Sequence, residues 1–280
     1  MAKLMLVDGS NLLFQMFYGM PSRITNKDGK AIQGTLGFIG ALLKTVRKIS
    51  PTHLVVFFDG ECHNPRRDID VQYKANRPDY SQIPEEETPF SQLPDIYAAL
   101  DHLNIKHLET TVCETDDWIA GYASRYGNRH DIVIMSQDSD FFQLVTDRVS
   151  ILRYRGDKSV LCTPNYIKQT LGVAPCQYAA YKSLTGDTSD NIRGVDKVGP
   201  KTASALMNQF ETLENLIEQA NSIQKPSIRK SITEQTDLII KNYKLICLRG
   251  YNDLPFRLDE LAFYDAGLTT TEVLRDIGLR

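Results

Sequence analysis

The chain has 280 residues, of which 42% are hydrophobic, and a formal net charge of −3. This apolar content is enough for one large hydrophobic core or two unequal ones. No stretch approaches the roughly 18 consecutive apolar residues of a membrane span, and Asp8 interrupts the opening apolar run before it is long enough for a signal peptide. The cysteines are scattered and include no C-x-x-C pair: Cys62, Cys113, Cys162, Cys176 and Cys247. We therefore expect a soluble cytoplasmic protein with reduced thiols and no membrane partner.

The first half of the chain alternates between two patterns. Short, β-branched apolar runs end in aspartate, which is typical of strands buried on both faces of a parallel sheet. They are KLMLVD (3–8), HLVVFFD (53–59) and DIVIMSQDSD (131–140). Helical patterns lie between them, at 35–48, 90–103 and 115–126. The alternation predicts an α/β domain over residues 1–162, with ligands beyond the carboxyl ends of the strands.

The second part of the chain has helical patterns and few strand signals. Thr163 and Pro164 are typical of an N-cap and a first helical turn, and Gly172 of a helix end. Residues 163–280 are expected to form a small helical domain packed on the first. The stretch 63–89, with four prolines and few apolar residues, fits neither pattern. Loops of that length are usually functional or disordered, and both interpretations stay open at this point.

Acidic residues gather at strand ends and in tight clusters. The two carboxylates of D-x-D share one face, and Asp187 and Asp190 lie one helical turn apart. A cap or a turn explains each motif alone, but clusters that converge at one sheet edge repel unless cations neutralise them. The oxygen-only set favours Mg²⁺ or Mn²⁺ over zinc, and ion pairs about 3.5–4 Å apart are typical of phosphodiester hydrolysis. The set is Asp8, Asp59, Glu114, Asp116, Asp117, Asp138, Asp140, Asp187 and Asp190.

Two further observations concern phosphate. Without these nine carboxylates, 35 − 9 = 26 acidic residues face 32 basic ones, so the rest of the chain carries +6 and can attract phosphate. The segment GVDKVGPKTAS (194–204) is one residue away from a P-loop, but Pro200 stands where the P-loop lysine belongs. Nucleotide binding by this segment is therefore not expected.

Several stretches occur in the order in which the 5′-nuclease family has them. They are LVDGSNLLFQMFYG, VVFFDG, YKANRP, CETDDWIAGYA, SQDSDFFQLV and LTGDTSDNIRGVDKVGPKTA. Over at least residues 3–204 the chain resembles the 5′→3′ exonuclease domain of bacterial DNA polymerase I and the free-standing flap endonucleases. The resemblance implies a PIN-like α/β domain with a mainly parallel central sheet flanked by helices. A small helix–three-turn–helix domain would follow, with a helix-hairpin-helix motif at about 186–206.

The same resemblance implies roles for individual residues. All nine carboxylates carry over as metal ligands. One Mg²⁺ is expected at Asp8, Asp59, Glu114 and Asp116, and a second mainly at Asp138, Asp140, Asp187 and Asp190, with Mn²⁺ as a substitute. Asp117 is expected to be shared between the ions or to lie outside the ligand set.

The segment 63–89 corresponds to the family's helical arch, through which a free 5′ end passes. Its Tyr73, Lys74 and Arg77 match Y-K-x-x-R, and Arg66 matches a further basic position. The cations are expected to clamp the scissile phosphate and Tyr73 to stack on a base. In the hairpin, backbone amides and a helix N-terminus are expected to hold a DNA phosphate, with a K⁺ ion nearby. The hairpin residues are Gly194, Val195, Lys197, Val198, Gly199, Lys201 and Thr202.

These patterns predict a metal-dependent, structure-selective 5′ nuclease that cuts 5′ flaps and shortens 5′ ends of duplex DNA. Primer removal or repair is the expected role, for a monomer whose partner DNA polymerase is a separate chain. One alternative is a PIN-type ribonuclease, which shares the acidic strand ends but lacks the hairpin. The other is a non-catalytic binder of branched DNA, which would be expected if metal ligands were missing.

Overall fold

The computed structural model describes residues 1–20, 22–60 and 64–279; Cys62 and residue 63, the first of the expected arch, lie outside them. The described chain contains a six-stranded sheet in the order β3-β2-β1-β4-β5-β6, parallel except for β6. Its strands are β1 (Lys3–Asp8), β2 (His53–Asp59), β3 (Lys106–Thr110), β4 (Asp131–Met135), β5 (Val149–Arg153) and β6 (Val160–Cys162). The prediction of a mainly parallel sheet is confirmed.

Helices cover both faces of this sheet, which explains why its central strands are apolar throughout. On β1, Leu4 and Leu6 face one core while Met5 and Val7 face the other, because side chains alternate along a strand. The second core is shared with α1 (Gly9–Gly19), α2 (Gln33–Ile49) and α4 (Leu93–His102), and the first with α5 (Thr115–Tyr126).

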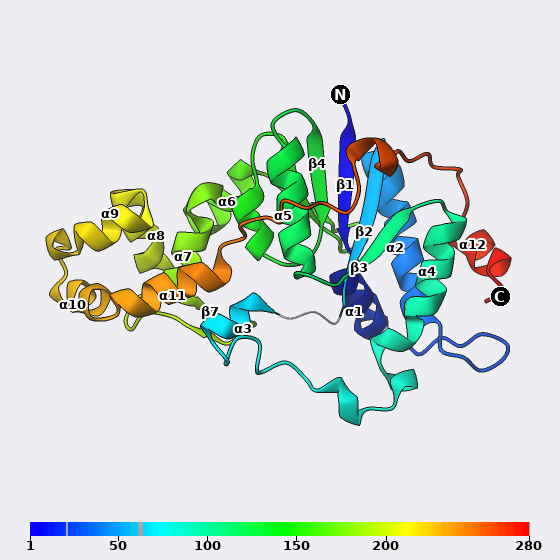
Figure 1. Cartoon of the computed structure of the whole chain (residues 1–280), viewed down its shortest axis with the longest axis horizontal. Coiled ribbons are helices and arrows are strands. Elements are labelled where there is room, and N and C mark those ends of the chain that lie inside the picture. The colour runs from blue at the N-terminus through cyan, green and yellow to red at the C-terminus, as the bar shows by residue number, and fades with distance from the viewer. Residues whose placement is uncertain (21, 61–63, 280) are drawn as a thin grey trace.

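The strand order determines at which point of the sheet edge the expected site lies. β1 pairs with β2 on one side and with β4 on the other. The chain runs from β1 through β2 to β3 on one side and then crosses to β4 on the other, so the strand order reverses at β1. Ligands of such sheets bind in the crevice at this switch point, beyond the carboxyl ends. Those ends point towards α3 (Pro65–Ile69) and the segment that follows it (Figure 1).

A helical unit extends from one side of the sheet (Figure 1). Its elements are α6 (Pro164–Leu171), α7 (Tyr178–Thr185), α8 (Pro200–Phe210), α9 (Leu213–Glu218), α10 (Pro226–Glu234) and α11 (Thr236–Ile246). The short hairpin of β7 (Gly186–Asp187) and β8 (Ile192–Arg193) lies between α7 and α8. The expected caps of α6 are present: Thr163 accepts a hydrogen bond from the Tyr166 amide, and Gly172 ends the helix at φ +74°.

The end of the chain differs from the prediction of one helical domain over 163–280. After α11 the chain returns to the sheet domain, where the Tyr251 amide donates to the Asp117 carbonyl and the Phe263 amide to the Thr52 carbonyl. Val273 of α12 (Thr270–Asp276) is buried in the core with α2 and α4. Helical periodicity shows that α12 has an apolar face but not which core buries it. No helix in the described part of the chain is long and apolar enough to cross a membrane.

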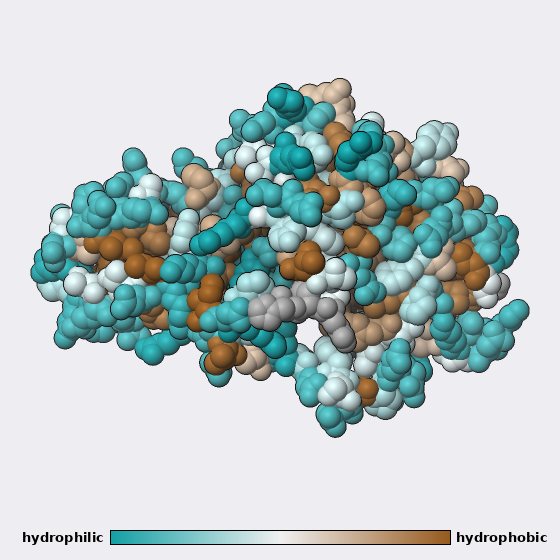
Figure 2. All heavy atoms as spheres, viewed as in Figure 1, coloured by the Kyte–Doolittle hydropathy of each residue, from teal (hydrophilic) through white to brown (hydrophobic). Residues whose placement is uncertain are grey.

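The described part of the expected arch, residues 64–89 (the arch segment), forms α3 and a series of turns and short 3₁₀ helices. Asn64 caps α3 by accepting a hydrogen bond from the Arg66 amide. Farther along, the Tyr80 ring makes edge contacts with Phe14 and Phe90, at centroid distances of 5.8 and 5.4 Å. The arch segment runs from beside α11 across to α4 (Figure 1), and the space-filling view shows an opening beside it (Figure 2).

Candidate metal centre and nucleic-acid interface

Asp8 and Asp59 end the neighbouring strands β1 and β2. Asp8 is buried; its Oδ1 accepts a hydrogen bond from the Asn11 amide at 3.0 Å, and its Oδ2 one from the Ser136 hydroxyl at 2.8 Å. Burial, and next the charge of Asp59, raise the pKa of Asp8 to about 7. Asp59 accepts a hydrogen bond from the Thr115 amide at 3.1 Å, which ties β2 to the start of α5.

Three more carboxylates lie close by, on the first turn of α5 and directly after β4. Burial and then the charge of Asp138 raise the pKa of both Asp116 and Asp140 well above the usual range. Burial likewise raises the pKa of Asp138. One carboxylate oxygen of Asp140 is buried and has no hydrogen-bond partner among the described residues. Each of these side chains is thus in surroundings that oppose its charge.

We call the carboxylates that form no ion pair with a described basic residue the inner carboxylates: Asp8, Asp59, Asp116, Asp138 and Asp140. Their all-oxygen donor set, and the raised pKa values of Asp8, Asp116, Asp138 and Asp140, suit a hard divalent cation, which would offset the mutual repulsion. As the described side chains stand, however, no group of three acidic, histidine or cysteine residues is arranged to hold an ion. Metal binding here therefore requires the carboxylates to turn towards the ion.

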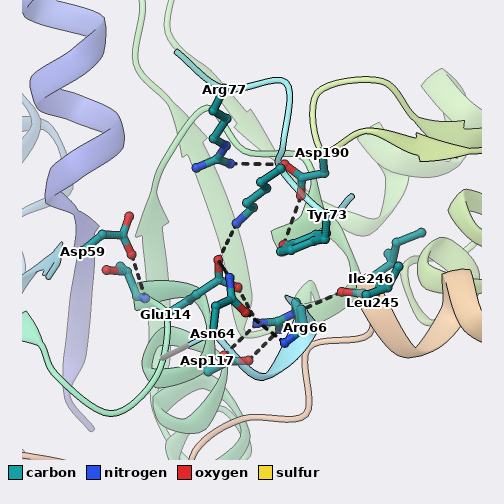
Figure 3. Close-up of polar contacts among 12 residues, drawn as sticks. Asp59, Asn64, Arg66, Tyr73, Arg77, Glu114, Asp117, Asp190, Leu245 and Ile246 are labelled. Atoms are coloured by element: carbon teal, nitrogen blue, oxygen red, sulfur yellow. Dashed lines mark hydrogen bonds and ion pairs between the residues drawn. The ribbon is translucent and has the colours of Figure 1, made fainter. Parts of the chain in front are cut away.

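The other four carboxylates, the outer carboxylates, are paired with cations. Figure 3 shows three of them, Glu114, Asp117 and Asp190. Glu114 contacts Lys74 at 2.6 Å and Arg66 at 2.5 Å, and Asp117 contacts Arg66 at 2.8 Å. Burial alone would raise the pKa of Glu114, but Lys74 and Arg66 hold it below its usual value. The remaining pairs are Asp190 with Arg77 at 3.1 Å and Asp187 with Lys182 at 2.7 Å. The expected assignment of four ligands to each ion stays a prediction. The structure instead separates the nine carboxylates into the five inner ones, without an ion pair to a described base, and the four outer ones, each with such a pair.

Arg66 and Tyr73, both expected to contact DNA, are buried. Arg66 is 8% exposed and directs its guanidinium at Glu114, Asp117 and the Leu245 carbonyl, whereas the neighbouring Arg67 is exposed. Tyr73 is 4% exposed and packs with Ile192, Leu245 and Ile246, so its ring is not open to a base. The expected phosphate contact of Arg66 and base stacking of Tyr73 do not fit these positions.

Lys74 and Arg77 lie beside the outer carboxylates, and the loop that carries Asp190 fixes the backbone around them. The Lys74 amide donates to the Asp190 carbonyl at 3.0 Å, and Lys74 itself has φ +56°, in the left-handed region. Asn191 donates from its side chain to the Gln72 carbonyl at 2.8 Å. Arg77 keeps 55% of its side chain exposed. The arch segment therefore presents its cations from a backbone that the hairpin loop holds.

The expected hairpin residues divide into two sets. Val195 and Val198 are buried, and their amides donate to the carbonyls of Leu184 and Val195. Gly194 is a packing residue, because an added Cβ would lie 2.3 Å from the Thr185 carbonyl oxygen. At the surface remain Lys197, Gly199, Lys201 and Thr202, of which Thr202 is half-buried.

The exposed start of α8 fits a phosphate better than the rest of the hairpin. A Cβ on Gly199 would meet no described atom within 4 Å, and no described side chain caps α8, whose first residue is Pro200. The amides of the first helical turn have no acceptor within the helix. They and the positive end of the helix dipole are thus available to an anion.

Two residues that orient the carboxylates, Ser136 and Lys182, lie outside the set predicted from the sequence. Ser136 donates to Asp8 and accepts from the Asp138 amide, and Lys182 neutralises Asp187. Ser136 and Asp138 are two residues apart just after a strand, a spacing that points side chains to one face. For Lys182 the sequence offers no such signal, because its contact depends on how α7 meets the hairpin.

The fold and the site together define a class of protein. Its members have a PIN-like α/β domain with an all-carboxylate centre, joined to a helical unit with an exposed hairpin. The model of the family described as 5′-3′ exonuclease, N-terminal resolvase-like domain, matches residues 3–172. That described as 5′-3′ exonuclease, C-terminal SAM fold, matches residues 173–267. The chain belongs to the 5′-3′ exonuclease family.

Curated relatives agree with this membership. DNA polymerase I of Rhizobium leguminosarum is 35% identical over 264 residues, covering 91% of this chain and 25% of the polymerase. The thermostable DNA polymerase I of Thermus aquaticus is 32% identical over 258 residues, covering 92% of this chain and 29% of the polymerase. The chain thus spans only 25% and 29% of the length of these polymerases.

Solved structures share the fold at lower identity. The T5 D15 protein co-crystallised with metal ions has a TM-score of 0.70 at 23% identity, covering 88% of this chain and 89% of that chain. The catalytic core of Rad2 in complex with a DNA substrate has a TM-score of 0.61 at 16% identity, covering 99% and 93%. At such identities the likeness establishes the fold.

Proposed function

We propose that this chain is a structure-selective, metal-dependent 5′ nuclease that hydrolyses phosphodiesters at 5′ flaps and 5′ ends of duplex DNA. The observation that carries the proposal is the position of the inner carboxylates. They lie beyond the strand ends, where Asp8 is buried, Asp59 is exposed and the other three are half-buried. They form no ion pair with a described base, and one Asp140 oxygen is buried without a described hydrogen-bond partner. Family membership agrees with this chemistry.

Mg²⁺, or Mn²⁺ in its place, would supply an activated water and offset charge on the reacting phosphate. Asp8, Asp116, Asp138 and Asp140 are the residues best suited to hold it, with Asp59 beside them. Lys74 and Arg77 are close enough to this centre to contact the scissile phosphate once a substrate competes for them. Cations placed there stabilise charge that grows on the phosphoryl oxygens as the bond breaks.

The helical unit supplies the grip on duplex DNA in this proposal. The open backbone at Gly199 and the first-turn amides of α8 can approach a phosphate closely. Lys197 and Lys201 are exposed on either side and add positive charge. A K⁺ ion near the hairpin belongs to the same proposal, since a cation between hairpin carbonyls and DNA would strengthen this contact.

The biological setting is part of the proposal. Primer removal or repair in the cytoplasm, by a monomer working with a DNA polymerase, fits a chain whose relatives are DNA polymerases I. The bacteriophage T5 D15 flap endonuclease has been crystallised with DNA and metal ions, which makes the flap the first substrate to test.

The test uses 5′-labelled flap, blunt duplex and single-stranded RNA, with Mg²⁺ or with EDTA. We expect cleavage of the flap and of the duplex 5′ end only with Mg²⁺. Asp138→Asn is expected to bind the flap yet not cut it, and wild-type turnover by this variant would contradict the proposed centre. Preferred cleavage of RNA would favour the ribonuclease alternative, and flap binding without cleavage would favour the non-catalytic one.

A further inference from the structure

We propose that Arg66 is a positioning residue of the metal centre, which fixes the acidic turn of α5 and joins it to the end of α11. The inference rests on the proposed function, because it concerns how divalent cations bind. It replaces the phosphate contact expected from the sequence with a role inside the protein.

The first observation is the bonding of the guanidinium (Figure 3). Arg66 donates from Nη1 to Asp117 at 2.9 Å and from Nη2 to the other Asp117 oxygen at 2.8 Å. The Nη1 atom also donates to Glu114 at 2.5 Å, and Nε donates to the Leu245 carbonyl at 3.0 Å. A planar fork that meets a carboxylate in this bidentate way fixes orientation as well as charge. At 8% exposure, the side chain has little room for DNA.

The second observation is what this bonding does to α5. Both Asp117 oxygens are bonded to Arg66, so Asp117 is a partner of Arg66 and not a metal ligand. Glu114 is held at both oxygens as well, by Arg66 on one and by Lys74 and Asn64 on the other. Asp116 lies between these two anchors in the sequence. Because Glu114 and Asp117 are held, the turn from which Asp116 extends towards the other inner carboxylates is fixed.

The third observation extends the connection to the hairpin. The Leu245 carbonyl lies in the last turn of α11, where no intrahelical donor is available, and Arg66 supplies one. In the same helix, Asn242 donates from its side chain to the Arg193 carbonyl at 2.8 Å and to the Ser183 carbonyl at 3.0 Å. Arg66 thus connects the carboxylates to the helix that supports β8.

Arg66→Gln tests the inference, and Arg67→Gln is the matched control because it removes the same charge from the exposed neighbour. We expect Arg66→Gln to raise the dissociation constant for Mn²⁺, measured by calorimetry without DNA, about 10- to 100-fold, as loss of an outer partner of a metal site does. Arg67→Gln should keep the wild-type Mn²⁺ affinity. Flap affinity in EDTA should fall no further in Arg66→Gln than in the control. A larger fall in flap affinity with unchanged Mn²⁺ affinity would make Arg66 a phosphate contact and overturn the inference.

A second pair of variants covers a possible folding defect. Asp117→Asn in the Arg66→Gln background removes the charge left without a partner, so both the unfolding temperature in EDTA and the Mn²⁺ affinity should recover towards wild type. Arg66→Lys, which keeps the charge but not the fork, should bind Mn²⁺ with intermediate affinity. A double variant that binds Mn²⁺ still more weakly than Arg66→Gln would make Asp117 a ligand and overturn the inference.

The same measurements separate this inference from the proposed function. A wild-type protein that binds no Mn²⁺ refutes the proposed metal centre and the inference together. If wild type binds Mn²⁺ and cuts the flap, but Arg66→Gln binds Mn²⁺ equally well, only the inference fails.

Discussion

Asp8→Asn is expected to stabilise the metal-free protein while abolishing its activity. Asp8 is buried at the end of β1, where burial and the charge of Asp59 raise its pKa from 3.8 to about 7. A carboxylate whose pKa is raised on folding costs stability once it ionises. Below about pH 3.8 the cost is absent; it grows as the pH rises and is complete above about pH 7.

The magnitude follows from the shift and the bonds that survive. A change from 3.8 to about 7 is roughly three units, and at about 1.4 kcal/mol per unit the ionised side chain costs about 4 kcal/mol at pH 8. Asparagine keeps an acceptor for the Asn11 amide and can face the Ser136 hydroxyl with its NH₂ group. Weaker, uncharged hydrogen bonds reduce the gain by about 1–2 kcal/mol. The net stabilisation is about 2–3 kcal/mol, or a rise of roughly 5–10 °C in unfolding temperature.

The assay is thermal unfolding of wild type and variant in EDTA at pH 4.5 and pH 8. We expect a clear difference at pH 8 and little at pH 4.5. Asp147→Asn is the control, since Asp147 is exposed and its substitution should change stability by no more than about 0.5 kcal/mol at either pH. Equal unfolding temperatures at pH 8, or the same gain at both values, would refute the electrostatic account.

Four further substitutions separate chemistry, DNA binding and packing. Lys74→Ala should raise the barrier by about 3–4 kcal/mol in single-turnover cleavage of a flap and lower flap affinity much less. Arg77→Ala should raise this barrier by a smaller amount. An equal loss of rate and affinity would make Lys74 a binding contact only. Gly199→Val should weaken binding of duplex-containing DNA, measured by titration, because its side chain would fill the open space before α8; unchanged affinity would limit the hairpin to a structural role. Gly194→Ala should destabilise the fold by about 1–3 kcal/mol in thermal unfolding, because its Cβ would lie 2.3 Å from the Thr185 carbonyl oxygen; a neutral result would contradict this packing role.

The sheet and its acidic edge could be predicted because their signals are local. A strand buried on both faces must be apolar along its length, and a carboxylate at its end is a visible exception. Asp8 and Asp59 follow from this pattern alone. The caps of α6 are equally local, since Thr163 and Gly172 act within one turn of the residues they cap.

The partners of the cations could not be predicted, because they depend on how distant segments meet. Arg66 and Arg67 are adjacent and equally basic, and only the orientation of α3 makes one buried and the other exposed. The return of α12 to the sheet domain is non-local in the same way. Its apolar residues must be buried in a hydrophobic core, but their pattern does not show whether this is a core of the sheet domain or that of the helical unit.

In the arch segment, the observed position of Lys74 differs from the role that the sequence predicts for it. Lys74 is expected to contact a phosphate, yet it is only 9% exposed and its Nζ lies 2.6 Å from Glu114. Both statements hold if the Glu114 oxygen that Lys74 contacts turns to a divalent cation while Arg66 keeps the other oxygen. A Glu114 carboxylate that ligates a divalent cation is a poorer partner for Lys74, because its charge is already offset. Metal binding should therefore release Lys74 towards the substrate.

This exchange predicts that Lys74 becomes more reactive towards an amine-modifying reagent when Mg²⁺ is added without DNA. A hydrogen bond to a charged group contributes about 1.5–3 kcal/mol, so its loss should raise the modification rate about tenfold or more. Peptide mass spectrometry measures the rate at each lysine, and Lys44 is the internal control. Lys44 is paired with the exposed Asp157, which is not one of the nine carboxylates, so Mg²⁺ should leave its rate unchanged. If Mg²⁺ binds and Lys74 stays as unreactive as in EDTA, Glu114 keeps its cation and the exchange does not occur.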